Sequence, residues 1–87
     1  MISYRHLPKS YELWTIGQRV NWLLHRRRLS QTEAAKLIGI SQATIANIIG
    51  SAARKPSAVT LIKMACALNC APSFILDGSG VSLNYEQ

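Results

Sequence analysis

Residues 30–49, SQTEAAKLIGISQATIANII, decide the fold of this chain. Ser30 and Glu33 have the spacing of a capping box, which predicts that a helix begins at Gln31. Gly39 follows that helix, at a point where a residue free to take a positive φ can end it. The inner face of this helix is predicted to consist of Ala34, Ala35, Leu37 and Ile38. The stretch thus begins with a short helix that ends in a tight turn.

A second helix is predicted over residues 42–49, with Ser41 as its N-cap. Its inward stripe is predicted to be Ile45, Ile48 and Ile49. Its other face carries Gln42, Ala43, Thr44, Ala46 and Asn47, and none of these is charged. Gln and Asn can hydrogen-bond an adenine edge, Thr can donate or accept, and Ala can touch a thymine methyl. The face predicts reading of DNA bases by Gln42, Ala43, Thr44 and Asn47; the alternative is an ordinary surface helix of a small bundle.

Residues 31–50 resemble the helix-turn-helix of the lambdoid-phage repressor and Cro proteins, the XRE-type family. The matching positions are Gln31 at the start of the first helix, Ala35 at the helix crossing, Gly39 at the turn, Ser41 and Gln42 at the start of the recognition helix, and Ile45 and Ile48 as its core anchors. The likeness runs from about Thr15 to Gly78. An isolated match to this motif is weak, but a match over five successive helices is specific. The resemblance implies an all-α, five-helix, lambda-repressor-like DNA-binding domain.

The charge of the chain also favours a nucleic-acid partner. Its 87 residues allow one domain, and the formal net charge is +6. Residues 34–76 contain four basic side chains and no acidic one. Such a field of one sign favours capture of a polyanion, although a charged surface kept for solubility is the alternative. No apolar run reaches the ~18 residues that span a bilayer, and no signal peptide opens the chain. We therefore expect a cytoplasmic protein with no membrane partner.

The residues offer little for catalysis or metal binding. Cys66 and Cys70 are four apart, and His6 and His25 have no spacing that would complete a metal site. The two cysteines are therefore predicted to be buried, reduced thiols. The sequence has no nucleophile elbow, no glycine loop for phosphate and only four scattered acidic residues. We expect no cofactor, no metal and no enzymatic activity.

Three further helices are predicted around the central pair. Thr15 and Gln18 form a second capping box, which predicts a helix from Ile16 that ends in a run of three arginines. Its core stripe is predicted to be Ile16, Val20, Leu23 and Leu24, with Trp14 and Trp22 packed nearby. A fourth helix runs from its cap Ser57 to Leu68, with Leu61, Met64, Ala65 and Leu68 in the core and Asn69 in the left-handed conformation after its end. A fifth begins at Pro72 and is closed by Gly78, with Ala71 as a weak cap.

These elements divide the chain into an N-terminal extension, residues 1–14, the helix-turn-helix domain, residues 15–78, and a C-terminal tail, residues 79–87. The extension is basic and either wraps DNA, as in some relatives of the resembled family, or is a loosely docked terminus. The tail contains VSLNY, whose alternation is typical of a strand, and it either pairs with a second copy or takes no fixed structure. The resemblance implies a dimer contact, and the candidates are Phe74, Ile75, Leu76, Val81 and Leu83.

Phosphate contacts are predicted at helix starts and at basic side chains. The candidates are Gln31, Ser41, Arg54, Lys55, Lys36 and Arg19; the resemblance implies backbone contact for the loop that contains RKP. The hypothesis is a sequence-specific transcriptional repressor of phage or bacterial type. It binds a palindromic operator of double-stranded DNA as a homodimer, with half-sites about 34–36 Å apart. Activation through a polymerase partner is equally compatible.

Three other interpretations stay open at this stage. The chain is the antitoxin of a toxin partner, or the N-terminal domain of a longer repressor, or a basic protein- or membrane-interaction module without base contacts. The last alternative predicts binding to any polyanion, with no sequence preference.

Overall fold

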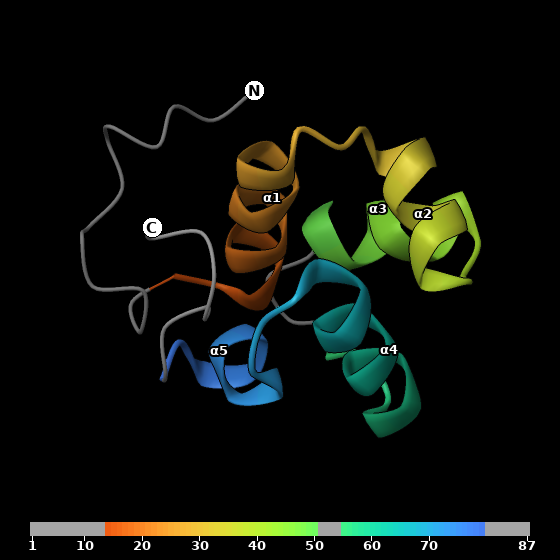
Figure 1. Cartoon of the computed structure of the whole chain (residues 1–87). Coiled ribbons are helices and arrows are strands. Elements are labelled where there is room, and N and C mark those ends of the chain that lie inside the picture. The colour runs from red at the N-terminus through yellow and green to blue at the C-terminus, as the bar shows by residue number, and fades with distance from the viewer. Residues whose placement is uncertain (1–13, 51–54, 80–87) are drawn as a thin grey trace.

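The computed structural model describes residues 14–50 and 55–79, and this part of the chain forms five helices and no strand (Figure 1). The helices are α1 (Ile16–Arg27), α2 (Gln31–Ile38), α3 (Gln42–Gly50), α4 (Ala58–Leu68) and α5 (Pro72–Asp77). The predicted all-α, five-helix fold is confirmed, and every helix begins where the sequence predicted. Two helix ends differ by one residue: α3 continues to Gly50, and α1 ends at Arg27, so the last arginine of the predicted run lies beyond the helix. The predictions for residues 1–13, Arg54, Val81 and Leu83 lie outside the described residues.

Reciprocal side-chain caps set the starts of α1 and α2. Thr15 Oγ1 accepts the Gln18 backbone N–H at 3.0 Å, and Gln18 Oε1 accepts the Thr15 N–H at 2.8 Å. Ser30 and Glu33 repeat this pattern at 3.0 and 2.9 Å. The bonds from Ser30 lower the pKa of the Glu33 carboxyl, since they favour its charged form. Both predicted capping boxes are confirmed, and the cap of α5 by Ala71 makes no side-chain hydrogen bond, as expected.

Four helices end at a residue in the left-handed conformation, including α5 at Gly78 as predicted, and three of the four share one hydrogen-bonded turn. Arg28, Gly39 and Asn69 have φ of 57°, 87° and 56°, and each follows the last residue of its helix. The next N–H then bonds back to the carbonyl five residues earlier, as from Ile40 to Ala35 at 3.0 Å. The predictions for Gly39 and Asn69 are confirmed. The same turn at Arg28 has no glycine or asparagine to signal it.

The core lies where α1 meets the other helices. Its fully buried members include Val20, Leu23, Leu24, Ala34, Ile45, Met64, Leu68, Phe74 and Ile75. Trp14 meets Trp22 edge-on with ring centroids 5.9 Å apart, and Trp22 lies 5.7 Å from Phe74. The packing role predicted for both tryptophans is confirmed. Ile49 and Leu61 are only partly buried, and Leu37 is 58% exposed, so the prediction of Leu37 on the inner face is wrong.

Two arginines of α1 bind the ends of other helices. The Arg19 guanidinium is 4% exposed and donates to the carbonyl oxygens of Ile75 and Leu76, each at 3.0 Å. Arg27 donates to the carbonyl oxygen of Leu68 at 2.7 and 3.0 Å and to that of Asn69 at 3.1 Å. These carbonyls have no partner within their own helices, because they belong to the last turns. Each arginine therefore holds one short helix to α1.

Burial corrects two further predictions. Phe74 and Ile75 were expected in a dimer contact, but both side chains are fully buried, because α5 turns them onto α1 and α4. Of the described candidates for that contact, only Leu76 is at the surface, with 43% exposure. Cys66 was expected to be buried, but it is exposed, on the side of α4 that lies toward α2. Cys70 is half-buried, and desolvation raises the pKa of its thiol to about 11.

Gly17 sets the distance between α1 and α3. A Cβ on Gly17 would lie 2.4 Å from the Ile49 carbonyl oxygen and 2.6 Å from that of Ile48. Both oxygens belong to the backbone of α3, so neither can move aside as a flexible side chain would. The absence of a side chain at Gly17 therefore lets the start of α1 pack directly on the end of α3.

We expect Gly17→Ala to lower the free energy of unfolding by about 2–3 kcal/mol, because the two helix backbones must separate to admit the methyl group. Thermal or urea unfolding measures this. Gly50→Ala is the matched control, since a Cβ there meets no atom within 4 Å. The control should keep or slightly raise the stability, because Ala is the better helix former. Equal stability of wild type and Gly17→Ala would show that the contact does not constrain α3.

Candidate nucleic-acid interface

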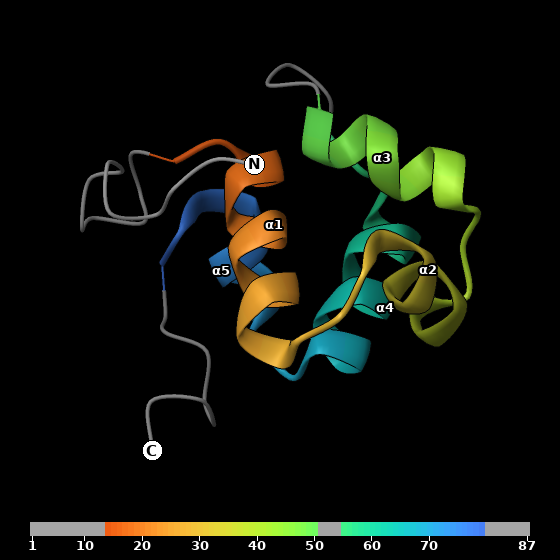
Figure 2. The same cartoon turned by 90° about the horizontal axis from the view of Figure 1, so that it is seen from above.

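The two helices of the predicted motif pack through small and branched side chains. Ala34 and Ala35 of α2 are buried, as are Ile45 and Ile48 of α3. Figure 2 shows α3 along one edge of the domain, with its last turn beside the start of α1. The side of α3 opposite its buried isoleucines faces away from the core. α3 therefore packs against the core on one side and is exposed to solvent on the other.

The open face of α3 carries no charge. Gln42, Ala43, Ala46 and Asn47 are all exposed, as a face that reads base edges must be. Ala46 was placed on this face by the sequence but not counted among the base-reading residues, and the structure presents it with the others. Of the predicted base-reading set, three residues lie on this exposed surface.

Thr44, the fourth member of that set, is placed differently. Its side chain is half-buried, and its Oγ1 lies 2.7 Å from the Ser41 Oγ. The Ser41 Oγ also accepts the Thr44 backbone N–H at 3.1 Å, so Ser41 caps α3 as predicted. The same arrangement recurs at the start of α4, between Ser57 and Thr60. Thr44 thus takes part in holding the start of α3.

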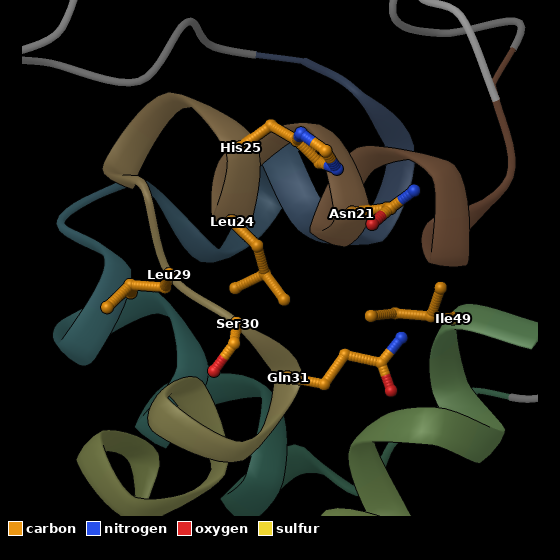
Figure 3. Close-up of a pocket in the computed structure, with 7 residues that line it drawn as sticks. All are labelled: Asn21, Leu24, His25, Leu29, Ser30, Gln31 and Ile49. Atoms are coloured by element: carbon orange, nitrogen blue, oxygen red, sulfur yellow. The ribbon is translucent and has the colours of Figure 1, made fainter. Parts of the chain in front are cut away.

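A hollow of about 320 Å³ lies between α1, the start of α2 and the end of α3. Figure 3 shows Asn21 and His25 of α1 on one side of it, Ser30 and Gln31 on the other, and Leu24 between them. The sequence predicted Gln31 as a site residue but missed Asn21 and His25. Their spacing of four residues places them on one face of α1, which was the available signal. That this face would meet α2 depended on the packing of the two helices.

The described cations divide between the surface and the interior. Lys36 and Lys55, both predicted to bind phosphate, are exposed. Arg26 stacks over Trp22, with its guanidinium carbon 5.8 Å from the ring centroid.

The two described carboxylates both accept hydrogen bonds from backbone N–H groups near helix ends. Glu33 caps α2, and Asp77 accepts the Ser79 N–H at 2.9 Å. The hydrogen bonds from Ser79 lower the pKa of Asp77, and the charge of Arg19 adds to this.

Arg19 does not fit its predicted role as a phosphate ligand. Besides its bonds to α5, its guanidinium donates to the Trp14 carbonyl oxygen at 2.6 Å. A phosphate would have to replace these buried carbonyls, and the side chain would have to leave the core. The structure therefore places Arg19 among the residues that hold the domain together, and we correct the prediction accordingly.

The sequence profile of the helix-turn-helix family matches residues 22–75, which is more than half of the chain. The chain therefore belongs to the helix-turn-helix family, and with it to the Cro/C1-type DNA-binding transcriptional regulators, which are not enzymes. No curated protein sequence matches the chain significantly. Within the described residues, no helix is long and apolar enough to cross a bilayer.

Solved structures share the fold. The P22 c2 repressor, in complex with synthetic operator 9T, is 24% identical with a TM-score of 0.70, over 76% of this chain and 98% of the repressor chain. The restriction-modification controller protein C.AhdI of Aeromonas hydrophila is 30% identical with a TM-score of 0.64, over 70% of this chain and 91% of its own. The complex of SinR with SinI matches at 25% identity with a TM-score of 0.69, over 83% of this chain and 70% of that one.

We expect Arg19→Lys to destabilise the fold by about 2 kcal/mol, because an ammonium cannot bind three carbonyl oxygens with the planar fork of a guanidinium. Urea unfolding measures the loss. The salt dependence of DNA binding by the folded variant should equal that of wild type. A flatter salt dependence with unchanged stability would return Arg19 to the phosphate-binding residues.

Proposed function

We propose that this chain is a sequence-specific transcriptional repressor that inserts α3 into the major groove of DNA. The observation that carries the proposal is the exposed, uncharged face of α3, supported from behind by Ile45 and Ile48. The nine residues of α3 span about 14 Å, which is close to the groove width of about 12 Å. Gln42 and Asn47 supply amides for base edges, and Ala43 and Ala46 supply small apolar contacts.

The DNA backbone is proposed to follow the helix starts that flank this face. Gln31 and Ser41 lie at the starts of α2 and α3, where backbone N–H groups favour an anion. Asn21 and His25 face Gln31 across the hollow, so a phosphate above it would meet polar groups from both sides. The exposed ammonium groups of Lys36 and Lys55 would neutralise further phosphates.

The active species is proposed to be a homodimer on a two-fold symmetric operator. One α3 helix reads only a few base pairs, which is too little to select a site in a genome. A dimer doubles the number of base pairs read, with half-sites about 34–36 Å apart. Exposed Leu76 at the end of α5 is the described residue that would contribute to the contact. Repression follows when the bound dimer occupies a promoter, and the similarity to the P22 c2 repressor supports a phage or bacterial origin.

The proposal is tested by selecting purified protein against random duplex DNA at about 150 mM salt, where non-specific binding is weak. We expect a palindrome with a defined spacing between its halves. A single half-site would argue against the homodimer while leaving base reading intact. Failure to enrich any sequence would contradict the role given to α3.

The same selection with Gln42→Ala tests the reading face directly. We expect binding to the preferred operator to weaken by about 1–3 kcal/mol per half-site, with relaxed preference at one base pair, because a bidentate amide contact is lost. The control is Thr32→Ala, which removes an exposed polar side chain from α2, outside the α3 face, and should leave the base preference unchanged. An operator preference of Gln42→Ala identical to wild type would remove Gln42 from the base-reading residues.

We expect Lys55→Ala to weaken binding to all sequences about equally and to reduce the slope of log K against log salt by about one unit. The matched control is Lys63→Ala, which removes the same charge from the face of α4 that lies toward α2. DNA binding by each variant, measured by fluorescence anisotropy at several salt concentrations, gives the two slopes to be compared. Equal slopes for the two variants would show that Lys55 adds only to the general charge and contacts no phosphate.

A further inference from the structure

Exposed apolar side chains are concentrated on α2 and α4. Four large apolar residues of the described part of the chain are strongly exposed, and three of them are Leu37 at 58%, Val59 at 64% and Ile62 at 55%. The fourth, Leu76, lies on α5. Single exposed apolar residues are ordinary, but several that share one surface mark an interaction site.

Of these residues, Leu37 and Ile62 line a groove of about 410 Å³ between α2 and α4. Its lining consists of Leu37, Ile38, Ile62, Lys63, Cys66 and Ala67. On α4, Val59, Ile62, Lys63 and Cys66 lie at i, i+3, i+4 and i+7, so they form one stripe along the helix. The stripe is about 10 Å long, or about two turns. A second amphipathic helix can pack along a stripe of this length.

The charge of the groove indicates what kind of helix would fit. Among the described residues that line it, Lys63 is the only charged one, and none carries a carboxylate. The nearest acid along α2 is Glu33, whose carboxylate is held by the backbone N–H of Ser30. A partner with carboxylates beside its apolar stripe would therefore meet a complementary charge.

The same charge argument disfavours the other occupants. A second copy of this chain carries ten basic and four acidic residues, and the acids Glu12, Glu33, Asp77 and Glu86 are scattered. With acids so far apart, no stretch of the sequence has the pattern of an acidic amphipathic helix. A nucleic acid would also fit poorly, because the described lining has one ammonium group and otherwise consists of aliphatic side chains and a thiol. None of these lining residues belongs to α3, so the groove is separate from the base-reading face.

We propose that the groove between α2 and α4 docks an acidic amphipathic helix of another protein. Apolar side chains of the partner at i, i+3 or i+4, and i+7 would cover Leu37 and Ile62, and its carboxylates would face Lys63. This inference does not depend on the operator proposed above, because it uses a different surface. A regulator with such a groove can be controlled by, or can recruit, a second protein.

The test is a selection from a displayed library of 14-residue amphipathic helices with acidic, basic or neutral flanks, using the full chain as bait. We expect acidic-flanked helices to be enriched. Binding of the selected peptides should slow alkylation of exposed Cys66 by iodoacetamide. Cys70 contributes little to this readout near pH 8, because a thiol with a pKa of about 11 is almost wholly protonated there.

Variants then locate the site. Leu37→Asn and Ile62→Asn should each weaken the selected peptides about tenfold or more, because each removes an apolar side chain from the contact. Lys63→Glu should reverse the preference, from acidic toward basic flanks. Thr32→Asn is the control and should leave peptide binding unchanged, since Thr32 is exposed on α2 and lies outside the lining of the groove. Because Leu37 and Ile62 are more than half exposed, their variants should keep the unfolding temperature and the DNA affinity of wild type.

Several outcomes would overturn the proposal. One is the absence of any enriched helix, and another is enrichment of helices that bind Ile62→Asn as well as wild type. Equal enrichment of acidic and basic flanks would remove the role of charge. Sedimentation that shows self-association, lost in Ile62→Asn, would identify a second copy of the chain as the occupant instead.

Discussion

The close approach of two helix backbones at Gly17 is the constraint on which the position of α3 depends. A Cβ at this position would come within 2.6 Å of two carbonyl oxygens at the end of α3, so only glycine permits the observed packing. Ile45 and Ile48 anchor the inner side of the same helix in the core. These contacts fix the position and orientation of α3 relative to α1 and the core, and so fix the orientation of its exposed face. This rigidity suits the proposed reading of base edges by α3, because displacements of about 1 Å break hydrogen bonds.

The arginines of α1 show how a basic protein can use its charge internally. Arg19 and Arg27 bind the last carbonyls of α5 and α4, which the short helices cannot satisfy themselves. Arg26 lies over the ring of Trp22. The net charge of +6 therefore overstates the number of cations directed at a polyanion. A planar guanidinium with five donors suits this internal role, since it binds two or three oxygens at once and stays charged when desolvated.

The two surfaces that the fold leaves open differ in chemistry. The face of α3 consists of amides and small side chains, which suit base edges but offer little apolar area. The groove between α2 and α4 has branched and sulfur-containing side chains, with one ammonium group. Leu37 belongs to the second surface because Ala34, Ala35 and Ile38 form the inward stripe of α2, and Leu37 lies to one side of that stripe.

The sequence by itself determined the features that depend on neighbouring residues. These local features are the capping boxes, the left-handed turns at Gly39 and Asn69, and the helical periodicity of apolar positions. Because each depends only on residues close in the sequence, the five helices and the uncharged face of α3 could be predicted from residue spacing. The tertiary structure decided which side chains meet across helices. It buried Arg19, Phe74 and Ile75, exposed Leu37 and Cys66, and brought Asn21 and His25 to Gln31. Hydrophobic periodicity identifies the apolar face of a helix but not the element that packs against it. Likewise, the sequence does not distinguish an arginine that binds a phosphate from one that binds a carbonyl oxygen. Only the packing of the helices separates these outcomes, because burial and hydrogen-bond partners depend on residues far apart in the chain.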